Sequence, residues 1–134
     1  MDGPRMDESG LRALGILAIA QVGDAVFELM VRARLCSSQP TAAKLHRARV
    51  KHVNAAAQAA YMERLEPLLT EAERDVARRA RNARAANVPK AVTRAEYAAS
   101  TAFEALLGYL YLSGQTGRLN ILFEELCHEN GAPG

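Results

Sequence analysis

The sequence predicts an all-α helical bundle, and three observations lead to this prediction. Apolar residues recur at helical spacing along nearly all of the 134 residues, and no stretch alternates with the period of two that is typical of strands. Alanine contributes 26 residues, which favours helices that pack at short distances. Aromatic residues make up only 5% of the chain, which also favours closely packed helices over a sheet. A chain of this length is typical of a single domain.

Five helices are expected, and local signals mark several of their ends. Thr70 and Thr93 each precede a glutamate by three residues, as in a capping box, so a helix should begin directly after each threonine. Pro89 prevents easy continuation of a helix, and the segment 87–93 is therefore expected to be a loop. The expected helices cover about 11–35, 42–65, 71–85, 94–113 and 117–129.

The helix expected at 94–113 has two distinct faces. Its core side is a stripe of four apolar residues, Phe103, Leu106, Leu107 and Leu110. Glu104 projects from the other face, among residues with hydroxyl groups, and Gly108 follows one turn later. A glycine at that place would let a neighbouring helix or a ligand come close.

Asp24 lies in the segment QVGDAVF, where apolar or small residues surround it. Only one other charge, Glu28, occurs between residues 13 and 30. Burying an unpaired carboxylate costs several kcal/mol. Asp24 is therefore expected to have a partner, which could be a basic residue, a set of backbone donors or a metal. Glu104 is a second lone acid in an uncharged stretch.

The two lone acids have a common explanation if their helices cross near them. Asp24 and Glu104 could then share a divalent cation, and Mg²⁺ is favoured because it binds one or two carboxylates together with waters and phosphate oxygens. Such an ion stabilises charge on a phosphate during its transfer. The alternative is that each acid forms a structural ion pair, with Arg32 or Arg94 as the candidate partner.

Basic residues gather in the middle of the chain. Between residues 44 and 94 there are twelve Lys and Arg against five acids, a net charge of +7, while the rest of the chain carries −5. This density indicates a polyanion partner, and a solvated helix face is the alternative. Aromatic residues do not interleave with the arginines, so contact with a duplex backbone fits better than stacking on single-stranded bases. The residues expected to position nucleic acid are Arg78, Arg81, Asn82, Arg84 and Lys90.

The cysteines and the hydropathy pattern indicate a cytoplasmic protein. The two cysteines lack the spacing of a zinc site or of a redox pair, which predicts reduced thiols. The longest uncharged run, 13–23, is shorter than the ~20 residues needed to span a membrane. The chain is therefore expected to be soluble and to lack a membrane partner.

Four segments, in this order, resemble the ribonuclease III catalytic domain: VGDAVFELMVR, LHRARVKHVNAAAQA, RRARNAR and TAFEALLGYLYL. The GDAV and FEALLGYLYL blocks are the most specific part of this match. The similarity spans a core of about 11–127 in a single domain that covers 1–134. More narrowly, the chain resembles the Mini-ribonuclease III branch, which consists of the catalytic domain alone.

The resemblance implies a homodimeric, Mg²⁺-dependent endonuclease that cuts both strands of double-stranded RNA and leaves 5′ phosphates with short 3′ overhangs. For the Mini-III branch, the implied substrate is the paired stem that flanks precursor 23S ribosomal RNA. Asp24 and Glu104 match the two family carboxylates that hold the catalytic metal. A ribosomal protein that presents the substrate is a further candidate partner.

The sequence departs from full-length ribonuclease III at two places. Those enzymes carry further acids four residues before the Asp and three before the Glu, where this chain has Ala20 and Thr101. The Mini-III branch shows the same reduction. The main alternative is a non-catalytic ribonuclease III-like protein that binds structured RNA. A helical protein-interaction module is a third reading, which leaves the arginines and both acids unexplained.

Overall fold

The computed structural model describes residues 3–83, 88 and 90–128. Within these residues the chain forms seven α-helices, one short 3₁₀ helix and no strand, so the prediction of an all-α fold is confirmed. The helices are α1 (Glu8–Arg12), α2 (Ile16–Leu35), α3 (Ala42–Val53), α4 (Ala55–Leu65), η1 (Glu66–Leu68), α5 (Glu71–Asn82), α6 (Arg94–Leu112) and α7 (Thr116–Cys127). None of the described helices combines the length and the hydropathy that a membrane span requires.

Two of the expected helices are each divided into two, so their prediction as continuous helices was wrong. The stretch 11–35 contains the end of α1 and all of α2, because Gly15 takes an extended conformation with φ −65° and ψ 141° before α2 begins. The stretch 42–65 is interrupted at Asn54, whose side-chain oxygen accepts a hydrogen bond from the Ala57 N–H at 2.8 Å and caps α4. Asparagine side chains compete with the helix for such backbone groups and therefore favour caps.

Both predicted capping boxes are present, and α5 and α6 begin where they were expected. At α5, the Thr70 hydroxyl accepts a hydrogen bond from the Glu73 N–H at 3.2 Å, and the Glu73 carboxylate accepts one from the Thr70 N–H at 2.9 Å. The same pair of bonds caps α6. The last helical residue of α5 is Asn82. The predicted ends at residues 85 and 129 lie outside the described residues.

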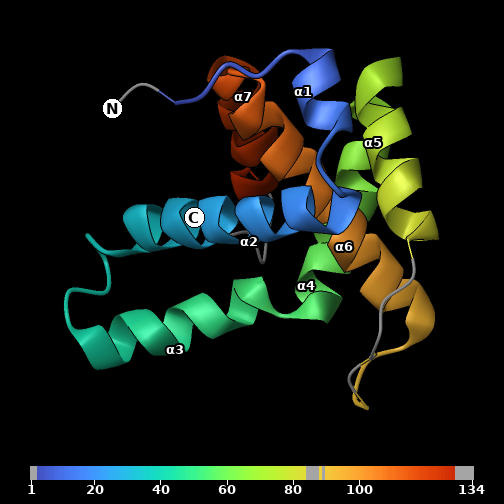
Figure 1. Ribbon diagram of the computed structural model, residues 1–134. Helices are drawn as coiled ribbons and strands as arrows, with labels where there is room; N and C mark the ends of the chain where they lie inside the picture. Colours follow the sequence, from blue (N-terminus) through green and yellow to red (C-terminus); the bar gives the residue numbers. More distant parts are fainter. Residues whose placement is uncertain (1–2, 84–87, 89, 129–134) are drawn as a thin grey trace.

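Helix α6 lies at the centre of the molecule, with α2, α4 and α5 packed around it (Figure 1). The four residues predicted to form its core side are all buried. Ser100, Thr101 and Gly108, on the face that carries Glu104, are buried as well, because α2 crosses α6 there. The expectation that a neighbouring helix or a ligand comes close to Gly108 is thus met by a helix.

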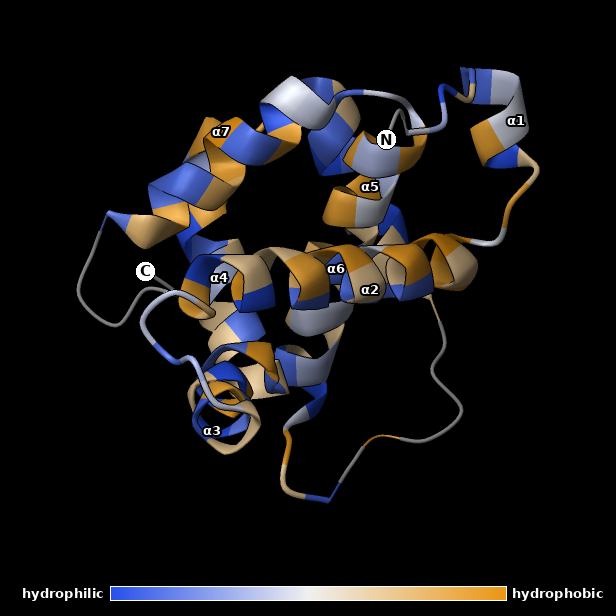
Figure 2. Cartoon of the chain, turned by 90° about the vertical axis from the view of Figure 1, so that its left-hand side faces the viewer, coloured by the Kyte–Doolittle hydropathy of each residue, from blue (hydrophilic) through white to orange (hydrophobic). Residues whose placement is uncertain are grey.

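Contacts between aromatic rings hold α2, α4 and α7 against α6 in the core. The ring of Phe27, on α2, is fully buried and meets Phe103 of α6 edge-on, with ring centroids 4.9 Å apart. Tyr61 and Phe123 bring α4 and α7 to the same ring. In Figure 2, α2 crosses the molecule with hydrophobic residues along much of its length. This packing fixes the position of α2 against α6.

A buried ion pair, which the sequence did not reveal, ties α5 to α7. Glu73 is 2% exposed, and its carboxylate accepts two hydrogen bonds of 2.9 Å from the Arg118 guanidinium. Burial acts to raise the pKa of Glu73, but the bonds from Arg118 and Thr70 outweigh it and leave the pKa below its ordinary value. The pair fixes the beginning of α5, the helix that carries most of the predicted nucleic-acid contacts.

Candidate active site

The backbones of α2 and α6 touch at two glycines. A Cβ atom added at Gly23 would lie 1.6 Å from the Glu104 carbonyl oxygen, and one added at Gly108 would lie 2.0 Å from the Ile19 carbonyl oxygen. No side chain fits at either position. Because Asp24 directly follows Gly23, this crossing places Asp24 beside Glu104. The predicted meeting of the two acids is therefore present in the structure.

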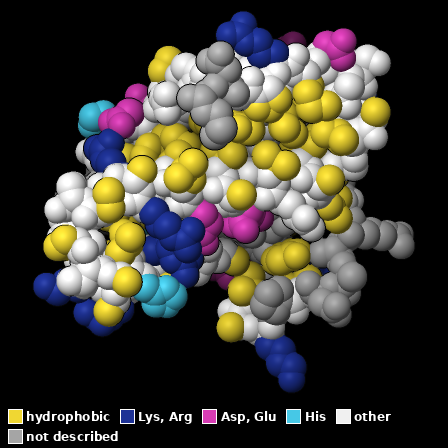
Figure 3. Space-filling model, turned by 60° about the vertical axis from the view of Figure 1, so that its left-hand side comes forward, with side chains coloured by type: hydrophobic (Ala, Val, Ile, Leu, Met, Phe, Trp, Pro, Cys, Tyr) yellow, Lys and Arg dark blue, Asp and Glu magenta, His cyan; other side chains and the backbone are white. Residues whose placement is uncertain are grey.

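The two carboxylates interact, and their environments differ. Asp24 is exposed, so the expectation that its carboxylate is buried was wrong, whereas Glu104 is half-buried. Burial raises the pKa of Glu104 to about 8, and a hydrogen bond with Asp24 and repulsion from Asp24 act in the same direction. The surface that contains α2 shows acidic side chains near the centre, with basic and hydrophobic side chains around them (Figure 3).

The raised pKa of Glu104 predicts a pH dependence of stability in the metal-free protein. The pKa of a glutamate in the unfolded chain is about 4.3, so between about pH 5 and pH 8 the folded protein holds more protons than the unfolded chain. The free energy of unfolding should therefore fall as pH rises through this window. Thermal unfolding of the wild type and of Glu104→Gln measures this: the variant should lose less stability across the window. Parallel pH profiles would contradict the prediction.

The structural ion pairs proposed for the two acids are not formed. Arg32 pairs instead with Glu28, at 3.4 Å, and Arg49 of α3 holds the other oxygen of Glu28 at 2.8 Å. Among the described residues, no Lys or Arg forms an ion pair with Asp24 or Glu104. Two arginines therefore neutralise Glu28, whereas no Lys or Arg among the described residues neutralises Asp24 or Glu104.

The positions that lack the additional family acids are both buried. Ala20 is 5% exposed and Thr101 is 8% exposed. Alanine offers no ligand atom, and the Thr101 hydroxyl donates its hydrogen to the Tyr97 carbonyl oxygen at 2.9 Å. Neither position supplies a charged ligand to the crossing.

The donor set fits Mg²⁺ better than a metal that needs a full cage of protein ligands. Within the described residues, no group of three or more His, Cys, Asp and Glu is placed to hold a metal ion. Asp24 and Glu104 supply two carboxylates, and Mg²⁺ commonly accepts one or two together with waters and phosphate oxygens. Burial is the main cause of the raised pKa of Glu104, and a bound cation would oppose both this effect and the repulsion from Asp24.

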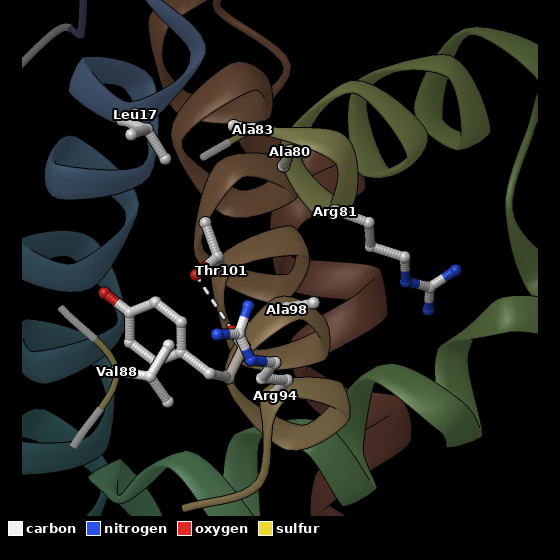
Figure 4. Close-up of a pocket in the computed structure, with 9 residues that line it drawn as sticks. Leu17, Ala80, Arg81, Ala83, Val88, Arg94, Ala98 and Thr101 are labelled. Carbon is white, nitrogen blue, oxygen red and sulfur yellow. Dashed lines mark hydrogen bonds between the residues drawn. The ribbon is translucent and has the colours of Figure 1, made fainter. Parts of the chain in front are cut away.

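A pocket of about 480 Å³ adjoins the site between α2, α5 and the first turns of α6 (Figure 4). Thr101, one helical turn before Glu104, forms part of its wall, and Arg94 and Tyr97 line it as well. Arg94 is exposed and forms no ion pair with the described residues. Neither Arg94 nor Tyr97 was predicted to contact nucleic acid. The sequence offered one indication: Tyr97 lies two helical turns before Glu104 and therefore on the same side of the helix.

Four of the five residues predicted to contact nucleic acid are described, and all four are exposed: Arg78, Arg81, Asn82 and Lys90. Arg84 lies outside the described residues. Arg78 forms an ion pair with Asp75, and Arg81 forms one with Glu66 at 2.7 Å. Neither pair was predicted, although the spacing of Asp75 three residues before Arg78 is a readable signal for one of them.

The sequence of this chain is similar to a known family over most of its length. Residues 17–115 match the Ribonuclease III domain family. A protein named Mini-ribonuclease 3 from Symbiobacterium thermophilum is 51% identical over 105 residues, which cover 78% of this chain and 81% of the relative. A protein of the same name from Gloeobacter violaceus is 44% identical, over 92% of this chain and 90% of the relative.

The fold is similar to that of a solved structure. A crystal structure of a protein from Fusobacterium nucleatum superposes with a TM-score of 0.77 at 27% sequence identity. The superposition covers 84% of this chain and 90% of that protein. Sequence and fold thus agree, and the matched residues 17–115 include both carboxylates of the crossing.

Proposed function

This chain belongs to the ribonuclease III family, and from this premise we propose that it is a Mg²⁺-dependent endoribonuclease that cuts double-stranded RNA. The family membership supports the endoribonuclease activity. The proposed dependence on Mg²⁺ rests on Asp24 and Glu104, two carboxylates that meet at the α2–α6 crossing. Among the described residues, no Lys or Arg forms an ion pair with either of them. We further propose that cleavage leaves 5′ phosphates.

The two carboxylates have distinct tasks at the proposed site. Asp24 is exposed and reaches the surface, where a phosphate can approach, whereas Glu104 is half-buried and must release its proton before it can bind a cation. When bound, Mg²⁺ would supply Lewis-acid stabilisation of the charge that develops on the scissile phosphate. We assign no described side chain as general base.

The exposed basic residues of α5 and of the segment that follows would position the duplex. Arg78, Arg81 and Lys90 can each neutralise a phosphate, and such contacts fix the register of a duplex without reading its sequence. Asn82 and Arg84 belong to the same proposed set. From the resemblance to the Mini-III branch, we propose the paired stem of precursor 23S ribosomal RNA as substrate and a ribosomal protein as a further partner. The cysteine and hydropathy patterns support a cytoplasmic location.

The outward face of α2 supports a homodimer. This face runs along the helix as a series of small or apolar residues, Ala18, Val22, Ala25 and Leu29. Leu29 is 67% exposed and Leu17, near the start of the helix, is 40% exposed. Contiguous exposed apolar surface of this kind is typical of protein interfaces. A second copy related by two-fold symmetry would bury the same face of both chains and provide one site for each RNA strand.

Replacing Leu29 by glutamate is expected to dissociate this dimer, because it places a charge at the centre of the apolar face. Analytical ultracentrifugation should show a dimer for the wild type and a monomer for Leu29→Glu. Leu68→Glu is the matched control, because Leu68 is 44% exposed on η1, away from α2, and should leave the dimer intact. A wild type that is monomeric and cuts both strands would contradict the proposal.

A cleavage time course tests the proposed function directly. End-labelled duplex RNA and the same strand unpaired are incubated with the protein and Mg²⁺, and in parallel with EDTA. Cleavage of the duplex alone, and only with the metal, is expected. The alternative is a protein that binds structured RNA without cutting it, which the uncharged residues Ala20 and Thr101 favour. Tight binding of the duplex without cleavage would establish that alternative.

A further inference from the structure

The surface of α5 that carries Arg74, Arg78 and Arg81 contains a hollow lined by both basic and acidic side chains. The hollow has a volume of about 650 Å³ and lies along α5 and the 3₁₀ helix before it. All six of its lining residues are charged, three arginines and three acids: Glu66, Glu71, Arg74, Asp75, Arg78 and Arg81. The positive charge that the sequence indicates on α5 is therefore partly neutralised at the surface of the free protein.

Two of these acids hold the two arginines that are expected to bind RNA. Glu66 Oε1 lies 2.7 Å from Arg81 Nη1, and Asp75 Oδ1 accepts a hydrogen bond from Arg78 Nη2. The second oxygen of Asp75 lies 3.8 Å from Arg12. A carboxylate offers a guanidinium the same acceptor oxygens that a phosphate offers. An RNA phosphate and a carboxylate of the protein therefore compete for the same guanidinium groups.

We propose that Glu66 and Asp75 compete with RNA phosphates for Arg81 and Arg78, and that this competition sets the selectivity of the enzyme for duplex RNA. The inference rests on the proposed function, because it takes the arginines as RNA contacts. An exposed ion pair is weak, so one carboxylate is easily displaced. A rigid duplex presents several phosphates at fixed positions and can displace both carboxylates together, whereas a flexible single strand must order itself to do so.

The test compares two acids of the same hollow. Glu66→Gln breaks the pair with Arg81, whereas Glu71→Gln removes an equal charge from an exposed residue that forms no ion pair with the described residues. Binding to duplex and to single-stranded RNA is measured in EDTA by fluorescence anisotropy. We expect Glu66→Gln to bind duplex RNA about two- to five-fold more tightly than Glu71→Gln does. The gain on single-stranded RNA should be larger, so that the preference for duplex falls.

A double-mutant cycle with Arg81→Ala shows where the gain arises. If Glu66 acts by holding Arg81, the gain from Glu66→Gln should fall, in the Arg81→Ala background, to the gain that Glu71→Gln gives there. Equal gains for Glu66→Gln and Glu71→Gln would overturn the inference and leave only an effect of net charge. An excess of the Glu66→Gln gain over the Glu71→Gln gain that persists without Arg81 would also overturn it. Far-UV circular dichroism of each variant confirms that the helices are intact.

The same measurements separate this inference from the proposed function. If the wild type does not bind duplex RNA, or if Arg81→Ala binds it as tightly as the wild type, the proposed RNA interface is wrong. If Arg81→Ala weakens binding but Glu66→Gln does not strengthen it beyond Glu71→Gln, the interface stands and the competition by carboxylates is refuted.

Discussion

Asp24→Asn and Glu104→Gln should each reduce cleavage of duplex RNA by a factor of at least ~100 while leaving RNA binding close to that of the wild type. Both substitutions keep the shape of the side chain and remove one of the two carboxylates that meet at the α2–α6 crossing. Loss of a group that merely supports a metal ligand typically costs 10- to 100-fold, and loss of a ligand should cost more. RNA binding should be kept because the basic residues proposed to hold the duplex are unchanged.

The rates are measured with end-labelled duplex RNA at saturating Mg²⁺, and binding is measured in EDTA. Glu63→Gln is the control, because it removes an exposed acid from α4 and should retain full activity. If either carboxylate variant retains turnover close to that of the wild type, the two-carboxylate site is wrong. A loss of binding parallel to the loss of cleavage would indicate misfolding rather than a missing ligand.

Among the glycines of the described residues, Gly23 is the one at which replacement by alanine is expected to reduce stability most. The new Cβ would lie 1.6 Å from the Glu104 carbonyl oxygen and 2.8 Å from the Gly108 nitrogen, both of which are backbone atoms that cannot rotate away. Helices α2 and α6 would have to separate, which disrupts the core around Phe27 and Phe103. Overpacking typically costs 1–3 kcal/mol, and we expect at least ~3 kcal/mol here.

Urea unfolding of Gly23→Ala and Gly117→Ala measures this effect. Gly117 is the matched control because it lies in α7 and a Cβ there meets nothing within 4 Å. Gly117→Ala should stabilise the protein by about 0.5–1 kcal/mol, since alanine is the better helix former. If Gly23→Ala has the stability and the activity of the wild type, the two helices do not cross in direct backbone contact.

Local sequence signals predicted much of the fold correctly. The capping boxes at Thr70 and Thr93 were readable because each depends on residues only three positions apart. The interruption at Asn54 was missed, although its cap is also local, because the apolar periodicity continues across it. Apolar periodicity indicates which face of a helix is buried, but it does not indicate where the backbone hydrogen bonds of the helix are interrupted.

The candidate site was predicted in part. Helical spacing placed Glu104 and Gly108 on one face, and the lack of neighbouring charges singled out Asp24. The ion pairs of Arg81 with Glu66, and of Arg118 with Glu73, join residues 15 and 45 positions apart in the chain. No spacing rule reaches that far, so these partners could not be assigned before the structure was known.

The sequence by itself determined the helical class, the two lone carboxylates, and the excess of positive charge between residues 44 and 94, because composition and short-range spacing are sufficient for each. Only the tertiary structure decided that Gly23 and Gly108 meet, which places Asp24 against Glu104 and raises the pKa of Glu104 to about 8. It also decided that Arg78 and Arg81 are paired with acids in the free protein. Both outcomes depend on distances of a few ångströms between different helices, and such distances are set by packing across the core, which the order of residues along one helix does not specify.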